Sequence, residues 1–424
     1  MRLLLVGAFP YPHHQGSQVY LQEQAIALRA AGAEVDLLTY PVAAPIGDDP
    51  ERWRALDGFR HLTPPAWTAR VPLRSGPSRG KPLADLGLAM TLRHAVASSS
   101  AGDDAYDAIL THHVEATLAA VHGLPRRARP PIVYCVHTLL ERELPAYYGL
   151  GADGPGRPQE PGIQEDPGHS RRSGASRALA WAGARLDAWA ARRADAWIAL
   201  TQSAERVMRE RGAALGACIP PGLPDPGLAH DADDATFVLA RHGLTRDGFL
   251  LYSGNLDAYQ ELGCLGRAVG ERERRGGGRL PVVVASHDAG VLRAGALPPG
   301  LRALPVASGR EMRALLRGAR ASLVMRRAPG GYPIKLVNSL AVGTPPITFL
   351  GAEWGLTSEQ DALVADPARP VETLARAIER LEDDPALAAR LGRGARTLYE
   401  RRHRPDRMAA RTLELIAALP RART

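Results

Sequence analysis

Lysine is rare in this chain, although the chain is rich in basic residues. Of the 53 Lys and Arg residues, Lys81 and Lys335 alone are lysine. Lys335 follows a basic, glycine-closed turn (residues 326–331) and Tyr332-Pro333, a pair that favours a helix start because proline's fixed φ suits the first turn. The N-terminal end of a helix dipole disfavours a lysine unless an anion is bound there. The pattern favours an anionic ligand over the alternative, a solvated lysine on an ordinary surface helix.

The residues around Lys335 supply further groups for such a ligand. The Arg326-Arg327 pair carries positive charge, and the Gly330-Gly331 pair lets the backbone approach a ligand closely. Asn338 lies three residues beyond Lys335, so both side chains share one face of the expected helix. Asparagine occurs elsewhere only at Asn255. We infer that so rare a residue is kept where a substitute would fail.

Three histidines follow two short apolar runs that are typical of buried strands. His112 and His113 come after Ala108–Leu110, and His137 comes after Ile132–Val136. Adjacent residues at a strand end point opposite ways, and no third ligand is evident, so we expect no metal site. Glu115 is more simply a charge that is favourable at a helix N-terminus. For His137 the residues alone leave two interpretations open: a histidine satisfied at a strand end, or a functional one.

The composition restricts the classes of protein to which this chain can belong. The chain has 424 residues, of which 45% are hydrophobic and 23% charged, as in a globular protein of two domains. The net charge of +8 indicates anionic partners. The three cysteines show neither disulfide nor metal spacing and suit a reducing compartment, so a cytoplasmic location is expected. No apolar run reaches spanning length, so membrane association would be peripheral, at the inner membrane face.

Alternating strand and helix patterns predict an α/β protein with two Rossmann-like, doubly wound domains that face a cleft. Strands are expected at Leu3–Val6, Val35–Leu38, Ala108–Leu110, Ile132–Val136, Ala196–Leu200, Phe249–Ser253, Pro281–Ala285 and Leu323–Met325. The run Ile219-Pro220-Pro221-Gly222 breaks the pattern, and we place the domain boundary there. A last helix is expected over Pro405–Leu419. Ligands belong at the carboxyl ends of the strands.

Two segments lack a clear pattern. Gly149–Ser176 is rich in Gly, Pro and Asp and predicts a mobile loop. From Glu51 to Arg93 the chain is poorly specified but rich in Arg, with Trp53 and Trp67 and few acids. It predicts a weak, salt-sensitive contact with an anionic membrane, although a solvated, arginine-biased surface explains it equally well. No basic and aromatic module supports nucleic-acid binding.

The ordered segments PYPHHQGS, VYCVHT, IALT, IPPG, LLYSGN and YPIKLVNSLAVGTPPI resemble glycosyltransferase family 4 over nearly the whole chain. That family consists of two-domain GT-B enzymes that transfer a sugar from a nucleotide donor with retention. The resemblance implies an acceptor domain over 1–220, with the loop at about 149–176, and a nucleotide-sugar domain over 221–404. A helix over 405–424 would return to the N-terminal domain. The acceptor, whether glycan, lipid-linked or small molecule, is not specified.

The resemblance also assigns residues. Gly16-Ser17 matches the loop that approaches donor phosphate and acceptor, with serine where a second glycine is usual. His137 matches the active-site histidine, and Lys335, matching a lysine of a family subset, joins it as a catalytic residue. The donor site would comprise Arg326, Arg327, Gly330, Gly331, Tyr332, Lys335, Asn338, Asn255 and Gln260.

Several of these positions depart from the family pattern. Its pair of carboxylates, spaced eight apart, falls on Gly330 and Asn338, and its Arg and Lys for the diphosphate fall on Asn255 and Gln260. Arg326 or Arg327 can restore the missing charge, and no metal or other cofactor is expected. Two alternatives therefore remain. One is a protein that binds a nucleotide sugar or glycan without transfer, and the other is a nucleotide-sugar epimerase.

Overall fold

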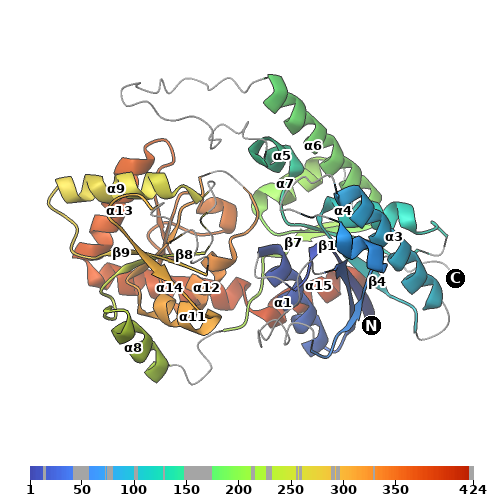
Figure 1. The fold of residues 1–424 in the computed structure, drawn as a ribbon, viewed down its shortest axis with the longest axis horizontal. Helices are drawn as coiled ribbons and strands as arrows, with labels where there is room; N and C mark the ends of the chain where they lie inside the picture. The colour runs from blue at the N-terminus through green and yellow to red at the C-terminus, as the bar shows by residue number, and fades with distance from the viewer. Residues whose placement is uncertain are drawn as a thin grey trace. The chain divides into compact units, whose positions relative to one another are not determined.

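The computed structural model describes residues 1–12, 16–41, 57–71, 73, 80–99, 104–127, 129–147, 174–211, 215–225, 232–254, 256, 260–287, 292, 297–327 and 330–419. The chain divides into two compact units (Figure 1). Unit 1 consists of Met1–Gly222, Gly330–Tyr332 and Pro405–Thr424. Unit 2 consists of Leu223–Pro329 and Pro333–Arg404. The last helix thus belongs to unit 1, although it follows unit 2 in the sequence.

Within the described residues, unit 1 contains a seven-stranded sheet in the order β3-β2-β1-β4-β5-β6-β7, with every pairing parallel. Its strands are β1 (Arg2–Pro10), β2 (Glu34–Tyr40), β3 (Arg60–Leu62), β4 (Ala108–His112), β5 (Ile132–Val136), β6 (Ala196–Ala199) and β7 (Gly216–Cys218). β4 and β5 are buried along their whole length, which explains their continuous apolar runs. The strand order reverses between β1 and β4. In open parallel sheets, ligands bind at the carboxyl ends of such a switch point.

Helices cover the sheet of unit 1. They are α1 (Gly16–Ala30), the 3₁₀ helix η1 (Ala66–Arg70), α3 (Lys81–Ser98), α4 (His113–Gly123), α5 (Leu140–Tyr147), α6 (Gly174–Arg193), α7 (Gln202–Glu210) and α15 (Pro405–Ala417). One core packs α3 and α4 on the sheet, and a second packs Trp197 and Met208 with α6 and α7. α15 packs against α1.

Within the described residues, unit 2 has a six-stranded sheet in the order β10-β9-β8-β11-β12-β13, again with every pairing parallel. Its strands are β8 (Leu250–Ser253), β9 (Val282–Ser286), β10 (Leu301–Pro305), β11 (Ala321–Val324), β12 (Pro346–Thr348) and β13 (Leu363–Val364). Its helices are α8 (Ala232–Arg241), α9 (Leu262–Arg274), α11 (Gly309–Gly318), α12 (Ile334–Val342), η4 (Ala352–Trp354), α13 (Pro370–Asp383) and α14 (Pro385–Arg402). Two apolar cores lie on the sheet, and the switch point is between β8 and β11. The prediction of two Rossmann-like, doubly wound domains is confirmed.

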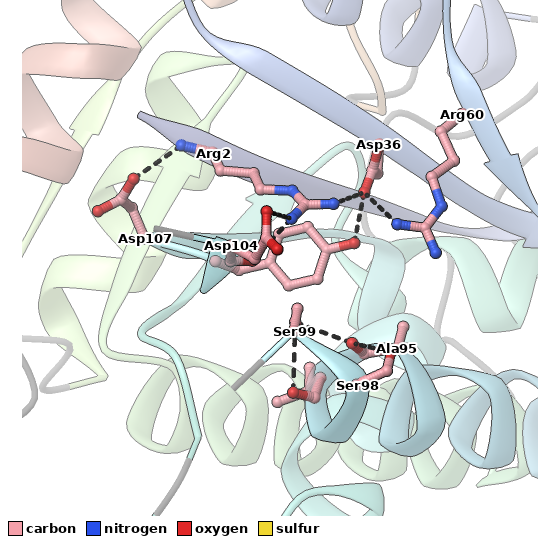
Figure 2. A network of polar contacts seen from close by, with 10 residues as sticks. Arg2, Asp36, Arg60, Ala95, Ser98, Ser99, Asp104 and Asp107 are labelled. Atoms are coloured by element: carbon pink, nitrogen blue, oxygen red, sulfur yellow. Dashed lines mark hydrogen bonds and ion pairs between the residues drawn. The ribbon is translucent and has the colours of Figure 1, made fainter. Parts of the chain in front are cut away.

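Polar contacts near the amino ends of β1, β2 and β3 hold the first strands together (Figure 2). The Asp36 carboxylate accepts hydrogen bonds from Arg2, at 3.1 Å, and from the Tyr106 hydroxyl, at 2.5 Å, and Arg60 lies 3.7 Å away. The backbone N–H of Arg2 donates to Asp107. Because the network lies at the opposite edge from the switch point, we assign it a structural role.

The sequence specified the structure of residues 51–93 poorly, and the described part of this segment contains a strand, the helix η1 and the start of α3. Arg60–Leu62 forms the edge strand β3, and α3 begins at Lys81. α3 carries apolar residues on more than one face, so its sequence lacks the clear helical period of an amphipathic helix. The segment 148–173, which covers most of the expected loop, lies outside the described residues. No helix in the described part of the chain is long and apolar enough to cross a bilayer.

Candidate functional site

The carboxyl ends of β1, β4 and β5 bring the histidines of unit 1 together. β4 ends at His112, α4 begins at His113, and His137 directly follows β5. His112 Nδ1 lies 2.9 Å from His137 Nε2, a hydrogen bond in which one ring donates and the other accepts. The His113 ring stacks on His137, with ring centroids 4.5 Å apart and planes at 18°. We call these three residues the histidine cluster.

The backbone of His113 explains why adjacent histidines meet the same partner. The expectation that His112 and His113 point opposite ways is wrong, because His113 has left the strand conformation and has φ 75°. The φ lies in the left-handed region, which side chains other than glycine rarely adopt. His113 Nε2 also lies 2.9 Å from Ser17 Oγ in the first turn of α1. Ser17 and His137, both predicted site residues, are therefore joined through His113.

Burial keeps the histidine cluster uncharged. His112 is fully buried and His137 is 5% exposed, and the edge of the Tyr20 ring packs on His137 with centroids 5.1 Å apart. Burial, and then the neighbouring His113, lowers the pKa of His112 to about 3. Burial also lowers the pKa of His137 well below its ordinary value, with His113 and His112 adding to the effect. The cluster offers neutral hydrogen-bonding groups at physiological pH.

The cluster is not arranged as a metal site. Its rings stack and hydrogen-bond to one another, whereas metal ligands converge on a point. No group of three or more His, Cys, Asp or Glu that could hold an ion occurs among the described residues. Glu115, in the first turn of α4, forms an ion pair with Lys81 at 2.8 Å. Burial raises the pKa of Glu115, but Lys81 and His113 outweigh it and hold that pKa below the ordinary value.

In unit 2, Lys335 lies at the switch point between β8 and β11. It is the second residue of α12, and its Nζ donates to Gln260 Oε1 at 2.8 Å. The same Nζ lies 4.0 Å from the ring centroid of Tyr252, a fully buried residue of β8. Gly254, with φ 123°, follows β8, and a Cβ at this position would lie 3.7 Å from Lys335 Nζ. The predicted residues Lys335 and Gln260 therefore meet, 75 residues apart in the sequence.

The ammonium of Lys335 has no carboxylate to balance it within the described residues. Burial, and then the charge of Arg326, lowers its pKa to about 7. The Arg327 side chain instead forms an ion pair with Glu261, so its charge is already balanced. A partly buried cation is stabilised when an anion binds beside it. The Lys335 ammonium, whose pKa burial and the Arg326 charge lower, is therefore suited to bind an anion.

The remaining predicted residues lie on α12, at the start of α1 and in the segment 330–332, or fall outside the described residues. Asn338 lies half-buried on α12, and Gly16 is the exposed first residue of α1. Gly330–Tyr332 belongs to unit 1, where a Cβ on Gly331 would lie 3.1 Å from the carbonyl oxygen of His137. This close approach favours glycine there. Asn255 and the pair His13-His14 lie outside the described residues.

The sequence analysis did not assign His112 and His113 to the site. The available signal was their position, because both follow a buried strand in the same way as His137. Since carboxyl ends of adjacent parallel strands meet at one edge of the sheet, that position favours joining them to His137. The misassignment came from treating both residues as strand residues, whereas the chain turns into α4 at His113.

Comparison with protein families identifies both halves of the chain. Residues 15–222 match the model of a glycosyl transferase 4-like domain, and residues 278–414 match that of a glycosyl transferase-like domain. No curated protein sequence matches the chain.

Solved structures agree with the fold over nearly the full length. Sucrose-phosphate synthase from Thermosynechococcus elongatus has a TM-score of 0.69 and 16% identity, with 98% of each chain covered. Anabaena HepE in complex with UDP-glucose has a TM-score of 0.67 and 15% identity, covering 99% of this chain and 100% of that one. WaaG, a glycosyltransferase involved in lipopolysaccharide biosynthesis, has a TM-score of 0.60 and 13% identity, covering 98% and 100%. This chain therefore belongs to the glycosyltransferases of the family 4 type and has the GT-B fold.

Proposed function

We propose that this protein transfers a sugar from a nucleotide-sugar donor to an acceptor with retention of the anomeric configuration, and that the donor binds at Lys335. The observation that carries the proposal is the ammonium of Lys335 at the switch point of unit 2, which has no carboxylate partner among the described residues and whose pKa burial lowers. The diphosphate of a nucleotide sugar is an anion that would stabilise this ammonium. HepE, which has the same fold, was crystallised with UDP and with UDP-glucose, which supports a donor of this class.

The role of Lys335 follows from the negative charge that develops on the donor during transfer. As the glycosidic bond of the donor breaks, negative charge accumulates on the leaving diphosphate. A fixed cation stabilises that charge more strongly in the transition state than in the ground state. The side-chain amide oxygen Oε1 of Gln260 accepts a hydrogen bond from Lys335 Nζ, and the Tyr252 ring packs on the ammonium, so the ammonium is held in position before the donor arrives.

Other groups of unit 2 can bind the remaining parts of the donor. We assign Arg326 to the diphosphate, because its charge acts on the Lys335 ammonium and it lies in the same part of unit 2. Asn338 follows Lys335 by three residues on α12 and can donate to, or accept from, a ribose hydroxyl. Because Lys335 and Arg326 supply the positive charge, no divalent cation is required. In unit 1, neutral His137 can hydrogen-bond a hydroxyl of the transferred sugar, and Ser17 belongs to the acceptor side.

Transfer and binding alone are the two outcomes to separate. The family's usual carboxylate pair is replaced by Gly330 and Asn338, which favours binding without transfer as the second candidate. A panel of nucleotide sugars, tested first by thermal shift, identifies the donor because a ligand stabilises the state it binds. Incubation of that donor with candidate acceptors, followed by NMR of the product, gives the anomeric configuration.

We expect a stabilising donor and a product with the donor's anomeric configuration, formed equally in the presence of a chelator. Lys335→Met is the matched control, since it keeps the length of the side chain and removes its charge. A donor that stabilises the protein but is never consumed would favour the binding protein. An inverted product would contradict retention, and activity that chelation abolishes and magnesium restores would contradict a metal-free mechanism.

A further inference from the structure

Helix α3 of unit 1 exposes a stripe of large apolar side chains. Leu83, Leu86 and Met90 are 54%, 53% and 51% exposed, and their spacing of three and four places them on one helix face. The opposite face is buried in the core through Ala84, Leu88, Leu92 and Val96, and α3 packs against α4 and β2. A helix that is covered on one side only normally has a polar outer face. The outer face of α3 is instead apolar.

The tryptophan of η1 extends this stripe. Trp67 is 39% exposed, and a Cβ placed on Gly87 of α3 would come within 3.6 Å of its ring. Gly87 thus leaves room for η1 to pack on α3, beside Leu86. We call Trp67, Leu83, Leu86 and Met90 the α3 surface. Its four large side chains come from two elements that lie in contact.

The exposed charged side chains on η1 and α3 are basic. Asp85 is the single acid between Gly58 and Gly102, and its carboxylate accepts a hydrogen bond from the Tyr40 hydroxyl. Arg70 and Arg93 are exposed and form no ion pair within the described residues. Lys81 and Arg60 contribute less, because they lie beside Glu115 and Asp36. The apolar stripe therefore has an exposed arginine on each of its two elements, Arg70 on η1 and Arg93 on α3, and no exposed acid on α3.

We propose that the α3 surface docks unit 1 on an anionic lipid bilayer. In this arrangement α3 lies in the plane of the interface, its three exposed apolar side chains enter the boundary of the acyl chains, and Trp67 lies at the level of the headgroups. Arg70 and Arg93 contact lipid phosphates, and the lack of acids avoids repulsion from the surface. A bilayer fits this pattern better than a protein partner because it presents apolar chains and a continuous layer of negative charge together.

Vesicle flotation of the full chain tests the proposal. The vesicles contain equal parts of phosphatidylglycerol and phosphatidylcholine, and pure phosphatidylcholine vesicles serve as the uncharged comparison. We expect binding to the anionic vesicles at low salt, weaker binding at high salt and little binding to phosphatidylcholine alone. Leu86→Gln/Met90→Gln keeps helix-forming residues and should weaken binding by about tenfold or more. Phe237→Gln is the matched control, since Phe237 on α8 of unit 2 is 71% exposed but lies outside the α3 surface.

The depth of Trp67 gives an independent readout. Brominated lipids should quench wild-type fluorescence more than that of Trp67→Phe, and the difference should disappear in the double variant. Failure to bind anionic vesicles at low salt, or equal binding by wild type and the double variant, would overturn the proposal. So would a double variant that changes the protein's oligomeric state while vesicle binding is absent, because the α3 surface would then cover a second copy. The assay contains no donor, so its outcome is independent of the proposed transfer reaction.

Discussion

The carboxyl ends of the strands hold opposite chemistry in units 1 and 2, at the switch point of unit 2 and next to that of unit 1. In unit 1 the ends of β4 and β5 present an uncharged cluster, with His112 bonded to His137 and His113 stacked on it. In unit 2 the ends of β8 and β11 present a cation, Lys335, held by Gln260 and Tyr252. A doubly wound sheet thus fixes where a ligand binds, and the side chains at that edge decide what kind of ligand it is.

The two sites also respond differently to burial. Burial penalises any charged form, and in the histidine cluster the result is simply neutral imidazoles. For Lys335, burial and Arg326 lower the pKa to about 7, so its charge depends on the presence of an anion. The neutral cluster suits hydroxyl groups of a sugar, whereas the cation suits a diphosphate. The predictions below test this contrast, in order of decreasing effect.

Removing the cation should have the largest effect. We expect Lys335→Ala to cost about 2–4 kcal/mol of transition-state stabilisation, which is roughly a 30- to 1,000-fold loss of kcat/KM. Lys335→Arg should recover only part of this loss, because the planar guanidinium does not fit where a compact ammonium contacts Gln260 and Tyr252. Steady-state kinetics with the identified donor measures both. If both variants keep the wild-type rate, the donor charge is stabilised elsewhere.

Replacing the neutral His137 should lower turnover and leave donor affinity nearly unchanged. His137→Ala would remove the proposed hydrogen bond to the transferred sugar, and we expect kcat to fall roughly ten- to a hundredfold. Nucleotide affinity, measured by calorimetry, should stay within about twofold, since the proposed nucleotide contacts are those of Lys335 and its neighbours in unit 2. A melting temperature for each variant detects general destabilisation, because the change also removes the partner of His112. A large loss of nucleotide affinity with normal turnover would contradict the division of roles.

The pH dependence of donor affinity should come from Lys335. Bound diphosphate favours the ammonium and raises its pKa above the free value of about 7. Below pH 7 the ammonium is already present, so affinity should be constant. Above pH 7 binding takes up a proton, and affinity should fall by up to about tenfold per pH unit until the pKa of the bound state is reached. Calorimetry with a nucleotide sugar measures this slope, and Lys335→Met should abolish it. A slope that persists in that variant would assign it to another group.

The smallest effect concerns the backbone that brings His113 to His137. His113 has φ 75°, so His113→Gly should be more stable than His113→Ala by about 1 kcal/mol, because glycine adopts the left-handed region without the penalty of a Cβ. Both variants lose the Ser17 contact equally, so their difference isolates the backbone term. Urea unfolding of the two variants provides the measurement. Equal free energies of unfolding would show that the left-handed backbone carries no cost.

Local sequence determined the parts of this protein that depend on neighbouring residues. The apolar runs at Ile109, Val133 and Leu251 identified strands because both faces of a central parallel strand are buried. Gly343 ends α12 with φ 73°, a left-handed conformation that glycine favours at a helix C-terminus. Lys335 was singled out by its rarity and its place at a helix start. These features require no knowledge of what lies across the sheet.

Elements with a weak local pattern were harder to predict. β7 and β10 pair with one neighbour each at the sheet edges, and β10 is partly exposed, so neither has the long apolar run of a central strand. α3 was missed because its outer face is as apolar as parts of its inner face. In each case the element forms through its contacts with the rest of unit 1 or unit 2, which outweigh a weak local pattern.

Tertiary structure alone decided which side chains meet. Gln260 lies 75 residues from Lys335, and His112 lies 25 residues from His137, so only the strand order could bring each pair within hydrogen-bonding distance. The pairing of Arg327 with Glu261, which leaves Arg326 as the arginine beside Lys335, is equally nonlocal. Periodicity reports how one segment is buried, whereas partners across a parallel sheet depend on crossover connections and on individual turns such as that at His113. Those are properties of the folded chain, because they exist only when distant segments are packed together.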